Sequence, residues 1–126
     1  MSNPTTIFLI DDDKFLIDMY TLKLSNGGFA VESSTSGVDA LKRLRDGFAP
    51  DIILLDIIMP TIDGLEILQT IQKEHLAPES MIIMLSNQAD DEAKAKSLGA
   101  KGFIVKAMNV PSQVVTQVKE IYLHGK

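Results

Sequence analysis

Carboxylates that could hold a metal ion or accept a phosphoryl group follow two apolar runs of the sequence. The run at residues 7–10 is followed by Asp11-Asp12-Asp13, and the run at residues 52–55 is followed by Asp56. Two like charges about 4 Å apart repel by about 4 kcal/mol at an effective dielectric of 20. Carboxylates that meet in one place therefore need a compensating cation or a raised pKa.

Two other polar residues end apolar runs in the same way: Ser86 and Lys106. One ammonium group does not balance three acids, and oxygen ligands with room for water favour Mg²⁺ or Mn²⁺. Such an ion, together with Lys106, would neutralise the charge on a phosphoryl group. We interpret Asp56, which stands alone, as the candidate acceptor, and the acidic pair Asp11 and Asp12 as a metal clamp.

The elements that must position these residues alternate between strand and helix patterns. Short continuous apolar runs are typical of strands buried on both faces of a parallel sheet, and the segments between them have helical spacing. The expected strands are residues 7–10, 29–33, 52–55, 81–85 and 103–105. The expected helices are residues 14–25, 36–45, a segment capped by Asp63, residues 89–98 and a segment that begins near Pro111.

Two of these helices have apolar stripes that we expect to face the core. In the first helix the stripe consists of Phe15, Leu16, Met19, Leu22 and Leu24. In the second helix it consists of Val38, Leu41 and Leu44.

Strict alternation of five strands and five helices predicts an α/β fold, a doubly wound five-stranded parallel sheet of order 2-1-3-4-5. Sites in such sheets form outside the carboxyl ends of the strands. Asp11, Asp56, Ser86 and Lys106 should therefore converge on one edge. The connections are short, so we expect a single domain over residues 1–126 with a core from about residue 6 to 123.

Composition excludes several functional classes. The 126 residues contain no cysteine, which rules out disulfides, thiolate zinc sites and a cysteine nucleophile. The net charge of -5 and the lack of a basic patch argue against nucleic-acid binding. No apolar run approaches the roughly 20 residues of a membrane span, and no signal peptide is evident. We expect a cytoplasmic protein.

The whole chain, from about residue 6 to 123, resembles the receiver domain of two-component response regulators. Four motifs carry the resemblance in the same order: residues 7–13, residues 50–60 with Asp63-Gly64, Met84-Leu85-Ser86, and residues 99–106. It implies a flavodoxin-like (βα)5 fold. It also implies a regulatory protein rather than an enzyme, with only self-directed phosphoryl transfer and autodephosphorylation.

The resemblance further implies the chemical partners of the site. Asp56 would accept phosphate from a histidine kinase or phosphotransfer protein. Asp12 would ligate Mg²⁺ directly, Asp11 would act through a bound water, and the backbone carbonyl of Ile58 would complete the protein's share of the metal shell.

The switch residues are implied in the same way. Lys106 would pair with Asp56 or its phosphate, Ser86 would swing inward to a phosphoryl oxygen, and Phe103 would move in concert. The change would reach a surface of the fourth helix, fifth strand and fifth helix, and so an unidentified downstream protein or output domain.

The chain departs from the family pattern at two positions. Ala107 stands where the family usually has a proline joined by a cis peptide. A cis bond without proline costs about 2.5–4 kcal/mol, so we expect a trans Lys106–Ala107 bond, with Lys106 still reaching Asp56. Asn87 replaces a small residue; it either narrows the approach to Asp56 or adds a hydrogen bond to phosphate.

Other functions remain as alternatives. A metal-dependent phosphatase or isomerase usually has a cap over its substrate, and the sequence has no such insertion. A flavin carrier would need a phosphate-binding loop after the first strand, where the acidic run repels phosphate. A phosphorylation-independent interaction domain would lose the site chemistry, whereas Asp12, Asp56 and Lys106 are all present.

Overall fold

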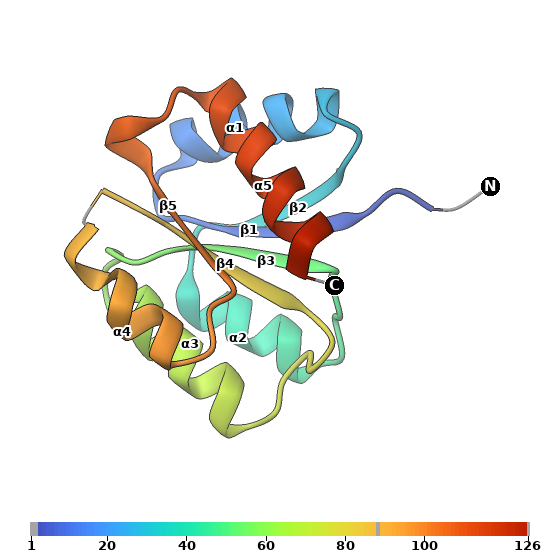
Figure 1. Ribbon diagram of the computed structural model, residues 1–126. Helices are drawn as coiled ribbons and strands as arrows, with labels where there is room; N and C mark the ends of the chain where they lie inside the picture. The colour runs from blue at the N-terminus through green and yellow to red at the C-terminus, as the bar shows by residue number, and fades with distance from the viewer. Residues whose placement is uncertain (1–2, 88, 126) are drawn as a thin grey trace.

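A parallel β-sheet of five strands forms the centre of the computed structural model, which describes residues 3–87 and 89–125 (Figure 1). The strand order is β2-β1-β3-β4-β5 and every neighbouring pair is parallel, which confirms the predicted topology. The strands are β1 (Thr6–Ile10), β2 (Ala30–Ser34), β3 (Ile52–Asp56), β4 (Met81–Ser86) and β5 (Gly102–Val105).

Helices cover both faces of the sheet, with α1 and α5 on one face and α2, α3 and α4 on the other (Figure 1). Their bounds are α1 (Lys14–Asn26), α2 (Gly37–Arg45), α3 (Gly64–Lys73), α4 (Glu92–Ser97) and α5 (Pro111–Gly125). There are also two 3-10 turns: η1 (Ala89–Asp91) directly precedes α4, and η2 (Lys106–Met108) directly follows β5. None of the helices in the described part of the chain has the length and apolar character needed to cross a membrane.

The sheet separates two hydrophobic cores. Phe8 and Ile10 of β1 belong to the core under α2, α3 and α4, whereas Ile7 and Leu9 belong to the core under α1 and α5. Successive side chains of a strand point to opposite faces, so a strand covered on both sides must be apolar throughout. This is why β1 and β3 are continuous apolar runs that end abruptly in a carboxylate.

Side-chain caps start the helices that follow the site strands. Asp13 accepts hydrogen bonds from the backbone N–H groups of Phe15 and Leu16 at 2.9 and 3.3 Å. Asp63 and Glu66 form a reciprocal capping box at the start of α3. These contacts satisfy backbone donors that have no partner inside the helix. The predicted capping role of Asp63 is confirmed.

The predicted core stripe of α1 is wrong in part. Ile17, Tyr20 and Leu24 face the sheet, whereas Phe15 and Leu22 are 75% and 60% exposed. Phe15 and Leu22 are seven residues apart and lie on the side of the helix opposite Ile17. Apolar residues occur on both sides of α1, and packing against the sheet selects only one of them.

Two further helix predictions need correction. Val38 of α2 is 52% exposed, and the buried face consists of Ala40, Leu41 and Leu44. The helix expected over residues 89–98 is divided into η1 and a six-residue α4 in which only Ala95 is buried. Before Leu98 the segment has no apolar residue larger than alanine, which leaves little to hold a longer helix against the sheet.

Candidate functional site

Three carboxylates converge at the carboxyl edge of the sheet. One oxygen from each of Asp11, Asp12 and Asp56 lies within 4.8 Å of the other two. Asp11 and Asp56 are 1% and 7% exposed, whereas Asp12 is open to solvent. Three hard oxygen donors with one side open to water suit a Mg²⁺-like ion, which keeps several of its waters. The arrangement can therefore hold a divalent metal ion.

Lys106 is the counter-ion of this cluster. Its Nζ lies 3.0 Å from Oδ2 of Asp11 and 3.2 Å from Oδ1 of Asp56, and its side chain is 9% exposed. No peptide bond in the described residues is cis, so the Lys106–Ala107 bond is trans as expected. The expectation that Lys106 still reaches Asp56 is also confirmed.

The buried charges shift one another's pKa. Burial raises the pKa of Asp56 to about 6; the carboxylates of Asp11 and Asp12 add to the rise, and the nearby Lys106 opposes it. Burial works against the charged form of Lys106, but Asp56 and Asp11 outweigh it and raise the lysine pKa. At neutral pH, Asp56 is mostly ionised and Lys106 is charged, which is the state required of a nucleophile beside a fixed cation.

The site opens into a cavity of about 310 Å³. Besides the charged residues, its lining includes Leu16, Ile58 and Asn87. Asn87 comes directly after β4, and Ile58 is the second residue after β3. Leu16 is half-buried and packs against the core under α1 and α5, as predicted, but it also lines this cavity from the first turn after the Asp13 cap. A position one helical turn from an acidic strand end is the signal that could have identified it.

Ser86 and Phe103 lie apart from the lining of this cavity. Ser86 ends β4, one position beyond Leu85, the register partner of Asp56, and its side chain is fully buried. Phe103 of β5 is half-buried and packs against the core under α2, α3 and α4. Ser86 therefore lies at the end of β4 and Phe103 lies within β5, and neither lines the cavity.

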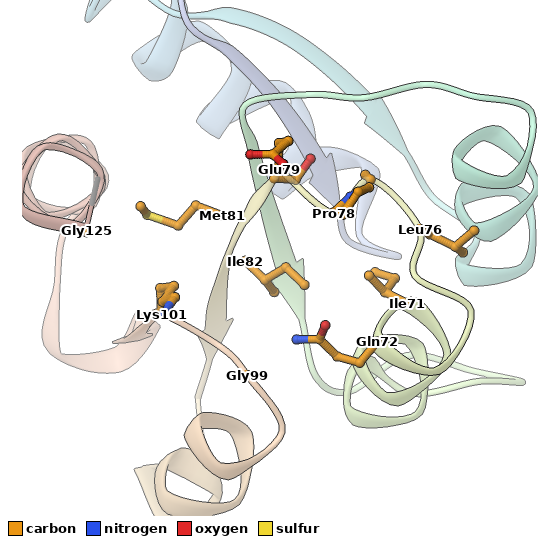
Figure 2. A pocket seen from close by; sticks show the side chains of 12 residues that line it. Ile71, Gln72, Leu76, Pro78, Glu79, Met81, Ile82, Gly99, Lys101 and Gly125 are labelled. Carbon is orange, nitrogen blue, oxygen red and sulfur yellow. The ribbon is translucent and has the colours of Figure 1, made fainter.

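A larger hollow of about 400 Å³ lies at the opposite edge of the sheet, where β4 begins (Figure 2). Figure 2 shows Lys101 and Glu79 beside it, together with the apolar side chains of Met81 and Ile82. Lys101 and Glu79 are exposed and carry opposite charges, so no charge there needs an added ion. Size alone does not identify a site, and the buried charges place it at the smaller cavity.

The comparison with known sequences gives a family and a relative. The sequence model of the response regulator receiver domain matches residues 7–119. Regulatory protein VanRc of Enterococcus gallinarum is 36% identical over 115 residues, which cover 90% of this chain and 48% of that protein. The chain thus spans about half the length of this relative.

Solved structures agree with the family match. The phosphorylated cyanobacterial phytochrome response regulator RcpA has a TM-score of 0.84 and 27% identity, with 98% of this chain and 96% of that chain covered. Response regulator TrrA of Thermotoga maritima, in complex with Mg²⁺ and BeF, has a TM-score of 0.79 and 27% identity, with 93% and 98% covered. From its sequence match and from the arrangement of its sheet, the chain belongs to the receiver domain family of two-component response regulators.

Proposed function

We propose that Asp56 accepts a phosphoryl group from a histidine kinase or phosphotransfer protein, and that Mg²⁺ supports the transfer. One observation carries the proposal: a single ammonium group, Lys106 Nζ, lies within 3.2 Å of the carboxylates of both Asp11 and Asp56. A receiver domain needs a nucleophile, a fixed cation and a metal clamp at one place, and these residues offer all three.

The metal ligands are those that the resemblance to receiver domains implies, and the grouping of the three carboxylates supports them. We assign Asp12 and Asp56 as direct ligands, Asp11 as a ligand through water and the backbone carbonyl of Ile58 as a further donor. Mn²⁺, which also prefers oxygen ligands, could replace Mg²⁺. When bound, the ion supplies positive charge against the oxygens of the phosphoryl group. That TrrA was solved with Mg²⁺ and BeF supports this choice of ion.

The transfer forms one bond and breaks another. An Asp56 oxygen attacks phosphorus, and the bond between phosphorus and the donor's imidazole nitrogen breaks. The electron pair of that bond stays on the nitrogen, which takes a proton from solvent. Lys106 remains charged and pairs with the phosphoryl oxygens, which lowers the energy of the transition state. Hydrolysis of the same acyl phosphate returns the carboxylate.

Phosphorylation would be detected by a partner through a change in the shape of the protein surface. Ser86 would donate its hydroxyl hydrogen to a phosphoryl oxygen, and Phe103 would move with it, which biases the surface of α4, β5 and α5 toward a downstream partner. The chemistry is confined to the chain's own Asp56. The comparisons lend no support to a phosphatase-like enzyme or to a phosphorylation-independent domain.

The test is phosphorylation by a small donor. The wild-type chain, Asp56→Asn and the control Asp46→Asn, which alters an exposed acid remote from the cavity, are incubated with acetyl phosphate and Mg²⁺. Intact mass should show one added phosphoryl group on the wild type and on Asp46→Asn, and none on Asp56→Asn. Labelling of Asp56→Asn at the wild-type rate would exclude Asp56 as the acceptor.

A further inference from the structure

We propose that Asn109 is a positioning residue that holds Lys106 between Asp11 and Asp56, and that Gln117 of α5 fixes Asn109 in turn. The inference rests on the proposed function, since it concerns the residue that pairs with the phosphoryl group. It identifies a physical connection from the site to α5.

Asn109 binds the backbone on both sides of Lys106. Its side-chain Nδ2 donates to the carbonyl of Val105 at 2.8 Å, and its backbone N–H donates to the carbonyl of Lys106 at 3.2 Å. These two carbonyls belong to the peptide units before and after the Lys106 Cα. Asn109 therefore restrains the backbone from which the lysine side chain leaves.

The orientation of the Asn109 amide is set by its partners. A carbonyl can only accept, so the group that faces Val105 must be Nδ2. Oδ1 is then left as an acceptor, and Nε2 of Gln117 donates to it. Both side chains are half-buried. The network joins the end of β5, the turn η2 and the second turn of α5.

Apart from Lys106 itself, burial does not hold this turn in place. Ala107 is exposed and Met108 is 76% exposed, so neither anchors η2 in a core. The lysine stem has four carbons and many rotamers, yet its ammonium is held between two carboxylates. We infer that the hydrogen bonds of Asn109 supply the anchor that side-chain packing does not.

This placement of Lys106 has two opposite effects. A fixed ammonium beside Asp56 favours phosphoryl transfer, but the same ammonium competes with a divalent cation for Asp11 and Asp56. Loosening Lys106 should slow labelling and leave metal affinity equal or higher. General damage to the fold would lower both, so the two measurements separate positioning from stability.

The variants are Asn109→Ala and Gln117→Ala, with Gln113→Ala as the matched control. Gln113 also caps a backbone group of this loop, because its Oε1 accepts from Val110 N–H at 2.9 Å, but among the described residues no hydrogen bond joins its side chain to the Lys106 turn. We expect Asn109→Ala to slow acetyl phosphate labelling by about two- to tenfold, the range for losing the one side-chain hydrogen bond that Asn109 makes to the backbone next to Lys106, at the Val105 carbonyl. Mn²⁺ affinity, measured by electron paramagnetic resonance, should equal or exceed that of wild type. Gln117→Ala should shift both measurements in the same direction, and Gln113→Ala should match the wild type.

A double-mutant cycle with Lys106→Met tests the route. If Asn109 acts through Lys106, Asn109→Ala should have no further effect on labelling once the lysine is gone. The NMR signal of the Lys106 ammonium, which does not depend on phosphorylation, should shift or broaden in Asn109→Ala. An unchanged signal, a wild-type labelling rate or an equal slowing in both backgrounds would overturn the inference. Absence of labelling in the wild type would instead contradict the proposed function, and the ammonium signal would still decide the role of Asn109.

Discussion

Burial gives Asp56 two opposed properties. It raises the carboxyl pKa to about 6. This value is still below neutral pH, so the side chain is mostly ionised there and can act as a nucleophile. Burial also makes the ionised form costly in the metal-free protein, because a buried charge loses its hydration. The charge that the proposed chemistry requires is therefore a source of instability until a cation compensates it.

We predict that Asp56→Asn stabilises the metal-free protein above pH 6. The folded pKa of about 6 lies above the unfolded value near 3.9, so protonation of Asp56 favours the native state. That contribution is fully present below about pH 3.9 and is lost as the pH rises through 6. Asparagine stays neutral at every pH, so its advantage should reach about 1–3 kcal/mol at pH 7.5 and shrink toward pH 4.

Urea unfolding with a chelator, between pH 4 and 8, measures this difference. Asp46→Asn, at an exposed position, is the control and should follow the wild type. An advantage of Asp56→Asn that grows as the pH falls would show that burial does not raise the pKa of this carboxyl.

The site residues at the strand ends could be predicted from the sequence, but a residue that positions one of them, such as Asn109, could not. Asp11, Asp12, Asp56 and Lys106 interrupt apolar runs, and parallel strands bring such positions to one edge. Asn109 lies in a polar loop, where its type is unremarkable. Its hydrogen bond with Gln117 depends on how α5 packs beside η2, which no spacing in the sequence encodes.

At the scale of elements, the junction of β3 and α3 leaves no room for a side chain at Gly64. A Cβ atom there would lie 2.1 Å from the carbonyl oxygen of Asp56 and 2.7 Å from Cα of Ile57. The backbone N–H of Gly64 donates to the carbonyl of Ile57 at 2.7 Å. Glycine thus permits α3 to begin directly against the end of β3, which carries the candidate acceptor.

We predict that Gly64→Ala destabilises the protein by about 2–4 kcal/mol, because backbone atoms must move. Gly37→Ala is the matched control, since it occupies the same first position of α2. Its new Cβ would lie 2.6 Å from Cδ1 of Ile67 and 2.8 Å from Cγ2 of Ile62, so the close contacts are with side-chain atoms, which yield more readily than backbone. Thermal unfolding of both variants gives the comparison, and a Gly37→Ala loss as large as that of Gly64→Ala would contradict the account.

A substitution at Thr21 of α1 should raise the stability of the protein, in contrast to Gly64→Ala. Its Oγ1 is buried and has no hydrogen-bond partner among the described residues. Thr21→Val keeps the shape and removes the unpaired hydroxyl, so we expect about 1 kcal/mol of added stability. Thr70→Val is the control, because Oγ1 of Thr70 donates to the carbonyl of Glu66 at 2.9 Å. Denaturant unfolding should rank Thr21→Val above the wild type and Thr70→Val at or below it; the reverse order would refute the explanation.

The spacing of apolar residues predicted where helices form, but it did not always predict which face of a helix is buried. In α1 the pairs Phe15 with Leu22 and Ile17 with Leu24 have the same seven-residue separation. Both pairs can form an apolar stripe, and the sheet covers only the second. Choosing between them requires the position of the sheet relative to the helix, which is set by the loops at each end.

At the scale of the whole molecule, the site joins strands that are far apart in the sequence. Asp11 follows β1, Asp56 ends β3 and Lys106 follows β5, and the ion pairs of Lys106 link all three. A cation bound to the acidic cluster would hold β1 and β3 together at the edge where the cavity lies. Metal binding should therefore be visible in global stability.

We predict that Mg²⁺ raises the melting temperature of the wild type through mass action on the native state. At ten times the dissociation constant, the gain should be about 1.4 kcal/mol, which corresponds to a few degrees for a domain of this size. Asp12→Asn should lose most of this increase, while Asp39→Asn, an exposed acid on α2, should keep it. An equal increase in Asp12→Asn would remove Asp12 from the metal site.

The architecture as a whole could be predicted because its causes act locally. Continuous apolar runs require cover on both faces, alternation with helices requires a parallel sheet, and handedness then limits the strand order. Side-chain contacts between elements, such as the hydrogen bond of Asn109 with Gln117 of α5, depend on many such choices at once. They could not be derived from any single segment of the chain.

The most direct test of the central claim locates the acyl phosphate on the chain. After reaction with acetyl phosphate and Mg²⁺, borohydride reduces an aspartyl phosphate to homoserine, and peptide mass spectrometry identifies the position. We predict homoserine at residue 56 and unmodified Asp11 and Asp12. Homoserine at residue 11 or 12, with residue 56 unmodified, would contradict the assignment of acceptor and metal clamp.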